Sequence, residues 1–279
     1  MKRVISGSVF VAVVAAFFLL RQFTPYPRLF DILIYFFLVC GTFELGRALK
    51  PYSLKGTLTG SVIFAALFAP VYIISESYLL SGKGWLFAVL FCVLSLFILS
   101  VRCLIENADL KKFCISALPL IYPALFLLSA LLSNDLPEPK GFLSMLMLFV
   151  IAPFSDTMAF ITGSLIGGRK LCPKLSPKKT WSGAIGGVIG GGVGGLLVYL
   201  VFSGYASTVS FFSPVLLFIL VGLFASVMTE AGDLFESFIK RRAGIKDMGK
   251  IMPGHGGIMD RIDGMLFAGV LIYFVFLAV

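Results

Sequence analysis

The sequence predicts an all-α fold: a polytopic integral membrane bundle of about nine transmembrane helices. Composition carries the first part of this prediction, because 59% of the 279 residues are hydrophobic and only 13% are charged. Soluble globular proteins carry roughly 25% charged residues, about twice the share found here. The apolar residues also gather in long runs, and a run of about 20 is enough to cross a bilayer as a helix.

The apolar runs follow one another along the chain with short polar breaks between them. The predicted spans are 4–20, 29–46, 57–74, 85–101, 113–132, 141–163, 181–202, 211–229 and 264–279. We interpret the first as a retained span, because it ends in F-F-L-L-R-Q-F without the small residues of a signal cleavage site. The predicted organisation is a set of N-terminal transmembrane helices, 1–140, and a C-terminal transmembrane region, 141–279, with cytoplasmic loops 164–180 and 230–263.

The positive charges predict an orientation. If the N-terminus is cytoplasmic and the spans alternate, all but four of the 23 Lys and Arg fall on the cytoplasmic side; the exceptions are Arg21, Arg28, Lys83 and Lys140. Such a bias is typical of cytoplasmic loops. We therefore expect a multi-pass protein of the cell's inner (cytoplasmic) membrane. The net charge of +9 then needs no nucleic-acid partner, since basic loops attract anionic lipid head groups.

A glycine-rich segment, G-A-I-G-G-V-I-G-G-G-V-G-G, runs from Gly183 to Gly195. A phosphate-binding loop is one interpretation, but the Lys-Ser/Thr that completes such a loop is missing. The favoured interpretation is a helix whose small faces let neighbouring helices approach closely.

Ionisable groups in or beside apolar spans are costly and usually functional, which draws attention to a few carboxylates. Asp233 and Asp260 lie at the end of one predicted span and the start of the next, so a folded-back loop would bring them to one depth. Carboxylates without His or Cys form the oxygen site that suits Mg²⁺. For Glu44 and Glu236 we favour the ordinary role of a helix-end cap or half of an ion pair.

Cationic residues surround these carboxylates and point to a polyphosphate substrate. In the second basic loop, S-P-K-K-T-W, Lys178 and Lys179 could grip phosphates, although a basic loop on the cytoplasmic side is an equal alternative. The single histidine, His255, suggests a general base. If the acceptor is a lipid phosphate it is already anionic at neutral pH, so a supporting contact to phosphate is the better role for His255.

These residues resemble the signature of the phosphatidate cytidylyltransferases, also called CDP-diacylglycerol synthases. The resemblance rests on a fixed spacing of Ser237, Lys240-Arg241, Lys246-Asp247, Pro253, His255-Gly256-Gly257, Asp260-Arg261 and Asp263. The upstream S-D-T-M-A-F and S-P-K-K-T-W-S-G stretches resemble further parts of that family. Two positions depart from the usual pattern, Met252 and Ser182, and only Ser182 touches the basic loop.

The resemblance implies that phosphatidic acid attacks the α-phosphorus of CTP, giving CDP-diacylglycerol and pyrophosphate. It implies Mg²⁺, a site facing the cytoplasm, and a homodimer. Whether a second, monovalent cation takes part is left open by the sequence. The implied metal ligands are Asp233 and Asp260, then Asp263 and Glu230. The other implied catalytic residues are Lys240, Arg241, Lys246, Arg261 and His255. The implied substrate-binding residues are Ser237, Lys178, Lys179, Asp156, Asp247, Gly256 and Gly257.

Two other functions stay open at this point. A CTP-dependent lipid kinase of the polyprenol type would move the γ-phosphoryl group to a lipid alcohol, and that acceptor would need a base. A cation transporter built around Asp156, Glu230 and Asp233 is less consistent with the sequence, because many transporters contain inverted repeats and none is visible here.

Overall fold

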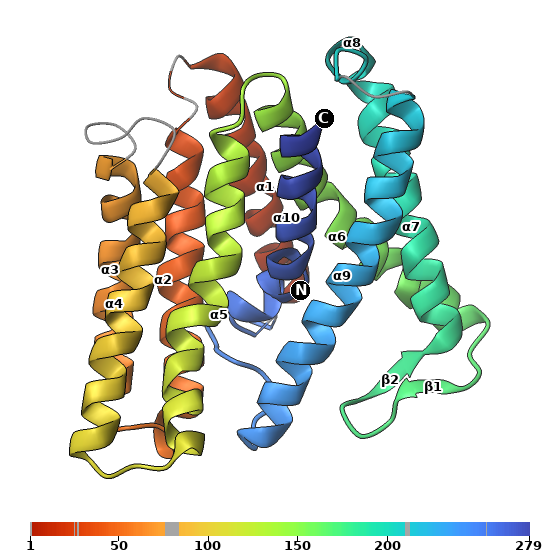
Figure 1. Cartoon of the computed structure of the whole chain (residues 1–279). Helices are drawn as coiled ribbons and strands as arrows, with labels where there is room; N and C mark the ends of the chain where they lie inside the picture. The colour runs from red at the N-terminus through yellow and green to blue at the C-terminus, as the bar shows by residue number, and fades with distance from the viewer. Residues whose placement is uncertain (1, 25, 27, 76–83, 210–212, 255) are drawn as a thin grey trace. The chain divides into compact units, whose positions relative to one another are not determined.

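A computed structural model describes the chain except residues 1, 25, 27, 76–83, 210–212 and 255 (Figure 1). In this described part, nine helices are long and apolar enough to cross a membrane, which confirms the polytopic helical fold. They are α1 (Lys2–Phe23), α2 (Leu29–Leu49), α3 (Thr57–Ile74), α4 (Gly84–Ile105), α5 (Leu110–Asn134), α6 (Lys140–Leu165), α7 (Trp181–Val201), α9 (Pro214–Arg242) and α10 (Met259–Ala278). The short elements are η1 (Lys50–Tyr52), β1 (Lys170–Cys172), β2 (Ser176–Thr180) and α8 (Ser203–Ala206).

By internal contacts the chain forms two compact units. The first comprises residues 1–128 and 243–261, and the second comprises residues 129–242 and 262–279. The segment 243–261, which holds much of the predicted signature, thus packs with the N-terminal helices. The functional division at residue 140 that the sequence suggests remains a prediction.

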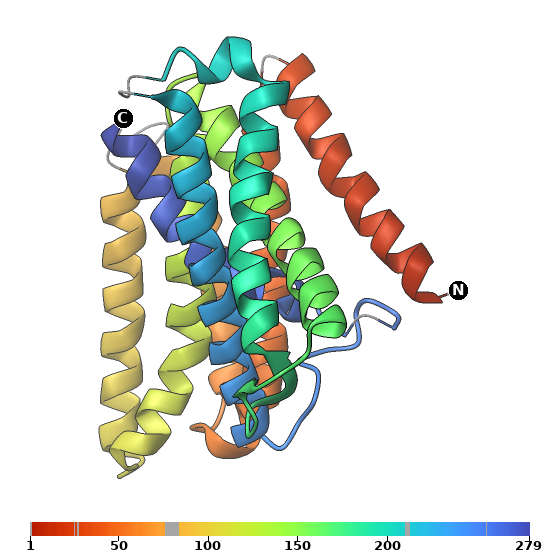
Figure 2. The ribbon, with the colours of Figure 1, turned by 90° about the vertical axis from the view of Figure 1, so that its right-hand side faces the viewer.

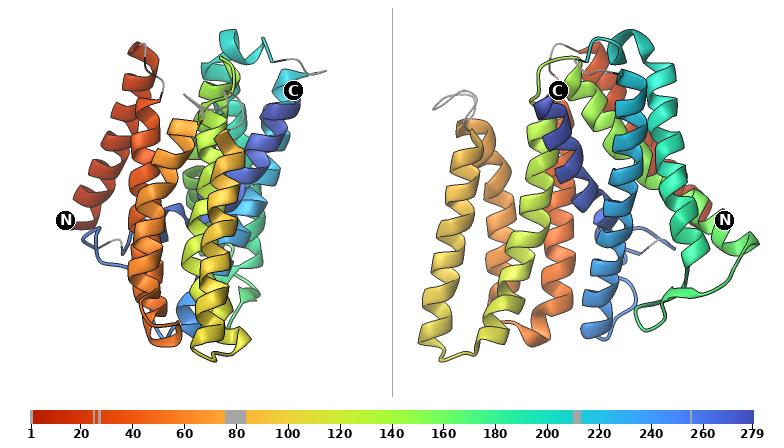
Figure 3. Two further views of the ribbon diagram at one scale, coloured as in Figure 1. Left: turned by 60° about the vertical axis from the view of Figure 1, so that its left-hand side comes forward. Right: turned by 45° about the vertical axis from the view of Figure 1, so that its right-hand side comes forward.

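In the first unit, α1 to α4 pack as consecutive antiparallel neighbours (Figure 3). Aromatic rings fill the contacts: Phe18 and Phe30 join α1 to α2 with centroids 4.7 Å apart, and Phe64 stacks on Phe91 between α3 and α4 at 5.1 Å. The Tyr35 hydroxyl donates to the Ala66 carbonyl at 2.9 Å, linking α2 to α3. Packing and occasional hydrogen bonds are what hold helices together where the surrounding lipid is as apolar as the side chains.

In the second unit, α7 packs along α6 and α9 (Figure 2). The glycine-rich segment is helical, as the packing interpretation predicts. A Cβ built on Gly190 would lie 2.5 Å from Met158 of α6, and one built on Gly191 would lie 2.5 Å from the Gly222 carbonyl oxygen of α9. Both separations are too short for real side chains. The helices can therefore approach this closely only because α7 carries glycine on both faces.

The polar segments contain regular structure that hydropathy alone does not predict. Residues 164–180 contain an antiparallel hairpin, with Lys170 paired to Thr180 and Cys172 to Ser176. The predicted loop 230–263 is also much shorter, because α9 continues to Arg242 and α10 begins at Met259.

The extension of α9 has local causes that a hydropathy profile does not register. Residues four apart pair along the helix, and Lys240, Arg241 and Arg242 occupy the last turn, where cations stabilise the helix dipole. The helix then stops before Gly244, whose φ of 71° ends it in the left-handed region.

We expect Gly195→Ala to destabilise the protein, because a Cβ there collides with the Phe218 carbonyl and forces α7 away from α9. Overpacking of this kind costs about 1–3 kcal/mol. Thermal unfolding followed by size-exclusion chromatography in detergent should show a lower Tm.

The matched control is Gly60→Ala in α3, where no atom lies within 4 Å of the added methyl group. Its Tm should be unchanged or higher, since alanine favours a helix by about 1 kcal/mol over glycine. Equal Tm values for the two variants would contradict the close packing.

Candidate functional site

The C-terminal half of α9 carries a row of ionisable and polar side chains. Side chains four apart on a helix face each other. The Ser237 hydroxyl donates to Asp233 (Oγ–Oδ1 3.3 Å), and the Lys240 ammonium donates to Glu236 (Nζ–Oε2 2.7 Å). The Glu236 side chain is fully buried and that of Lys240 is 11% exposed. A buried charge is costly without a partner, so this ion pair is what lets Glu236 sit inside the protein.

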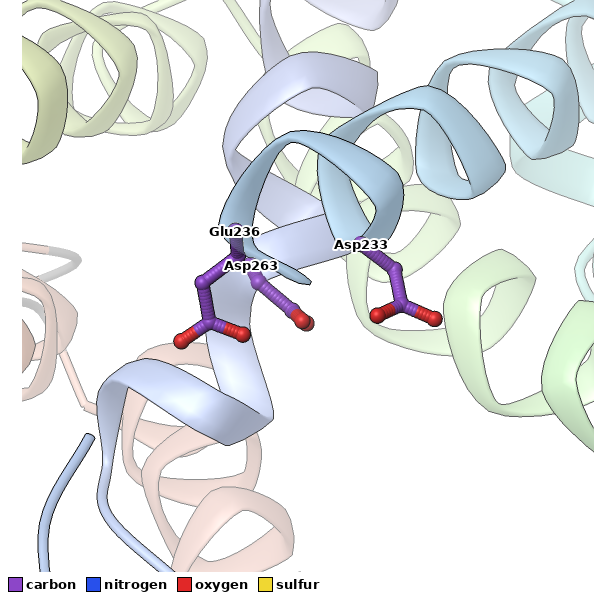
Figure 4. A group of neighbouring side chains, drawn as sticks. All are labelled: Asp233, Glu236 and Asp263. Atoms are coloured by element: carbon purple, nitrogen blue, oxygen red, sulfur yellow. The ribbon is translucent and has the colours of Figure 1, made fainter. Parts of the chain in front are cut away.

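Asp263, in the first turns of α10, lies next to these side chains and forms a cluster of three carboxylates with Asp233 and Glu236 (Figure 4). One oxygen from each of the three residues lies within 4.8 Å of the others. We call these residues the acidic cluster. Three converging carboxylate oxygens, without nitrogen or sulfur ligands, make a site whose chemistry fits a hard divalent cation such as Mg²⁺.

Two glycines allow α9 and α10 to come close enough for this cluster. A Cβ on Gly232 would lie 2.5 Å from the Asp263 carbonyl oxygen, and a Cβ on Gly264 would lie 2.5 Å from the Thr229 side chain. The backbones therefore touch at this crossing. Any larger side chain at either glycine would push Asp263 away from the carboxylates of α9.

Lys179, on β2, reaches the same region from the hairpin. Its ammonium lies 2.6 Å from Asp233 Oδ2 and 2.8 Å from Glu230 Oε2. Burial alone would lower the pKa of Lys179, but the charges of Asp233 and Glu230 outweigh burial and hold this pKa well above its usual range. Lys179 is therefore a fixed positive charge beside the acidic cluster.

Caps and hairpin contacts hold Lys179 in place. The adjacent Thr180 is the N-cap of α7, and its hydroxyl accepts the Gly183 backbone N–H at 3.1 Å. On the other side of the hairpin, Arg241 donates to the Leu175 carbonyl at 3.2 Å. The hairpin is thus bonded both to the start of α7 and to the end of α9.

Asp156, on α6, faces the same group of charges. Its carboxylate is near enough to Asp263, Asp233, Lys179 and Glu230 to interact with their charges. In its own unit, the structure therefore brings together predicted residues from α6, the hairpin, α9 and α10. For Glu236 the sequence predicts a helix-end cap or half of an ion pair; the ion pair with Lys240 is present, and Glu236 also belongs to the acidic cluster.

Asp260 belongs to the other unit, where it organises the loop that precedes α10. Its Oδ2 accepts backbone N–H groups from Met248 at 2.9 Å and from Gly257 at 2.8 Å. Gly254 and Gly256 have φ values of 81° and 89°, so only glycine fits this loop without strain. The predicted pairing of Asp260 with Asp233 as metal ligands stays a prediction.

Glu44, on α2, holds the same loop from a distant part of the sequence. Its Oε2 accepts the Met259 backbone N–H at 2.9 Å, so it caps α10 across 215 residues, and its side chain lies against Gly249 and Gly257. Glu44 is 2% exposed, and its Oε1 accepts no hydrogen bond from the described residues. The expectation of a helix-end cap is confirmed, although the capped helix is not its own.

The remaining predicted residues occupy the surface of these segments. Lys178, Arg241, Lys246, Asp247 and Arg261 are exposed, as expected of side chains that would meet a soluble, phosphate-bearing substrate. His255 lies outside the described residues, between two glycines of the loop.

We expect Glu44→Ala to loosen the loop 243–258, because it removes the acceptor for the Met259 N–H. Loss of a cap costs about 0.5–2 kcal/mol. One or two kcal/mol corresponds to roughly 5- to 30-fold more of the opened form. Cleavage by trypsin at the exposed Lys246 and Lys250 measures this opening.

Two variants control that experiment. Glu44→Gln keeps an acceptor of the same shape and should resist trypsin nearly as well as the native protein. Glu106→Ala removes only an exposed partner of Arg102 and should leave cleavage of the loop unchanged. Native resistance in Glu44→Ala would contradict the capping role.

Comparison with known proteins shows which family the chain resembles. The Cytidylyltransferase family model matches residues 1–279. The phosphatidate cytidylyltransferase of Rickettsia typhi is 35% identical over 195 residues, which covers 67% of this chain and 82% of that protein. The phosphatidate cytidylyltransferase of Brucella abortus is 40% identical over 144 residues, 52% of this chain and 50% of that protein.

The match therefore spans about half the length of the Brucella relative, and 54% of the length of a Rickettsia bellii protein of the same name that is 37% identical. Whole-chain coverage by the family model, together with the long Rickettsia typhi match, shows the relationship. The chain belongs to the cytidylyltransferase family.

Proposed function

We propose that this protein transfers the cytidylyl group of CTP to phosphatidic acid, producing CDP-diacylglycerol and pyrophosphate. The observation that carries the proposal is the acidic cluster at the α9–α10 crossing, with Lys179 and Lys240 bonded to its members. Carboxylates interleaved with lysines suit a site that handles a polyphosphate. Family membership and the names of the relatives supply the identity of the two substrates.

The proposed reaction exchanges one phosphorus–oxygen bond for another. A phosphate oxygen of phosphatidic acid attacks the α-phosphorus of CTP, and the bond from that phosphorus to the bridging oxygen breaks to release pyrophosphate. A phosphomonoester has its second pKa near 6, so the attacking oxygen is already anionic at neutral pH. The protein then has to position two anions and neutralise them, which lysines and arginines can do without a general base.

The residues present fit the Mg²⁺ that the family resemblance implies. Asp233 and Asp263 are the proposed ligands in the acidic cluster, and Glu236 lies beside them. Asp260 is the predicted partner of Asp233 as a ligand. Glu230, a further candidate ligand, forms an ion pair with Lys179. When bound, Mg²⁺ would neutralise part of the triphosphate charge. A second, monovalent cation belongs to the proposal as well.

Each basic residue has a proposed share of the remaining charge. Lys179 is held beside Asp233, where it can shift from carboxylate to phosphate when CTP arrives. The exposed side chains of Lys178, Arg241, Lys246 and Arg261 would contact phosphates from the aqueous side. Ser237 and His255 would add polar contacts, and Gly256 and Gly257 would let the backbone approach the substrate.

The proposed setting is the inner membrane, with the site facing the cytoplasm. The charge bias of the loops supports this orientation, because Lys and Arg concentrate in segments that share one side if the N-terminus is cytoplasmic. CTP would then enter from the cytoplasm and the lipid from the bilayer. A homodimer is the proposed assembly, by resemblance to the family.

The test of the function is product identity. With labelled CTP and phosphatidic acid in detergent, we expect CDP-diacylglycerol and pyrophosphate in equal amounts. Release of CDP with a phosphorylated lipid alcohol would instead establish the lipid kinase. Ion flux in liposomes without nucleotide would favour the transporter.

We expect Asp260→Asn to abolish turnover while the protein stays folded. Asparagine keeps an oxygen for the Met248 and Gly257 N–H groups, so the loop is retained while the negative charge is lost. Loss of a single electrostatic group at an active site commonly costs about 10²–10³ in kcat. A folded variant with near-normal turnover across a Mg²⁺ titration would exclude Asp260 from the reaction.

The control for this substitution is Asp109→Asn. Asp109 accepts the Lys112 backbone N–H at 3.0 Å at the start of α5, and asparagine caps a helix as well as aspartate does. This variant makes the same chemical change far along the chain from the signature. Its turnover should equal that of the native protein.

A further inference from the structure

An apolar groove lies between α1 and α2 in the first unit. The two helices meet near the end of α1 and the start of α2, and they diverge toward the start of α1, where part of the loop 243–258 lies (Figure 3). The groove has a volume of about 870 Å³. Ligand pockets generally span roughly 300–1,000 Å³, so this one is large enough for a sizeable molecule.

One continuous face of α1 lines the groove. Its lining residues recur every three or four positions, which is one side of a helix: Ser6, Val9, Phe10, Val13, Val14 and Phe17. The facing wall of α2 is equally apolar, with Ile32, Leu33, Phe36 and Phe37. Apart from one serine, the helical walls offer only hydrocarbon and aromatic surface, so the matching ligand is itself hydrocarbon.

The end of the groove nearest the start of α1 is lined by the loop 243–258. Ile251, Met252, Pro253 and Ile258 line it, and the Ser6 hydroxyl donates to the Pro253 carbonyl at 3.0 Å. This is the same loop whose backbone N–H groups bind Asp260. A hydrocarbon chain in the groove would therefore end beside residues assigned to the head-group chemistry.

The positive charge at that end would favour an anionic lipid. Lys250 directly precedes the lining residue Ile251, and both Lys250 and Lys246 are exposed on the loop. A ligand that is apolar along its length and anionic at its end satisfies both features. A zwitterionic or uncharged bilayer lipid would fill the apolar part without placing a net negative charge at the cationic end.

We propose that the groove between α1 and α2 binds an acyl chain of the phosphatidic acid substrate, and that α1 thereby contributes to selecting the lipid. The inference rests on the proposed function for the identity of the head group. Because both helices are membrane spans, the chain would enter the groove sideways from the bilayer. The phosphate would then lie at the loop, where Lys250 can neutralise it.

Substitutions within α1 test the groove by filling it. Val13→Trp adds a large side chain to the lining, whereas Val11→Trp adds the same side chain to an exposed position that does not line the groove. We expect Val13→Trp to raise the KM for long-chain phosphatidic acid about tenfold, the scale of steric discrimination in an apolar pocket. The KM for CTP should not change, and dioctanoyl phosphatidic acid should be affected less because its chains are shorter.

The proposal is overturned if Val11→Trp has the same effect as Val13→Trp, or if dioctanoyl and long-chain substrates respond equally. A substitution that simply unfolded the protein would change the KM for CTP or the yield of folded protein. Photolabelling of the native protein avoids substitution altogether. Phosphatidic acid with a diazirine in one acyl chain should label α1, α2 and residues 251–258, and excess unlabelled phosphatidic acid should compete.

Photolabelling also separates this inference from the proposed function. Suppose that phosphatidic acid competes with labelling of the groove but the protein makes no CDP-diacylglycerol. That result would support the lipid site and contradict the proposed enzyme activity. If the protein turns over but the labels spread evenly over all lipid-facing helices, the activity is supported and the groove is not the acyl-chain site. Competition by uncharged diacylglycerol as strong as that by phosphatidic acid would contradict the role of the cationic end.

Discussion

The arrangement of the candidate site depends on the contact between the backbones of α9 and α10. Gly232 and Gly264 remove the side chains that would keep the helices apart, and Asp263 thereby reaches Asp233 and Glu236. Three carboxylates in so small a space repel one another unless cations share it. Lys240 and Lys179 supply that charge, each bonded to a member of the cluster. Helix packing and electrostatics are therefore inseparable here.

The need to pair buried charges also explains how other carboxylates are held. Removing an ionised group from water is costly, so each buried carboxylate must find a donor or a cation. Glu236 uses a lysine four residues along its own helix, whereas Glu44 uses the free N–H at the start of α10. The loop 243–258 has little regular structure of its own, and it is held by hydrogen bonds to carboxylates. A segment ordered in this way can present backbone N–H groups and glycines where a phosphate could approach.

Much of the architecture was predictable because hydropathy is a local property. Predicted spans such as 57–74 and 181–202 agree with α3 and α7 to within a residue, and the glycine-rich segment is the packing helix that its small faces predict. The predicted loop 230–263 is wrong over its first part, which is helical. Residues 230–242 are charged yet helical, because their charges pair along the helix and at its C-terminus.

By itself, the sequence determined the apolar spans, the basic loops and the set of residues that resemble the family signature, since each depends only on neighbouring positions. Tertiary structure alone decided which carboxylates converge, because residues distant in sequence meet only when helices pack. It brings Glu236 into the acidic cluster, where the sequence predicts only a helix-end cap or half of an ion pair. It also places Glu44 at the start of α10, 215 residues away. No local pattern encodes those contacts, since they depend on how closely glycine lets two backbones approach.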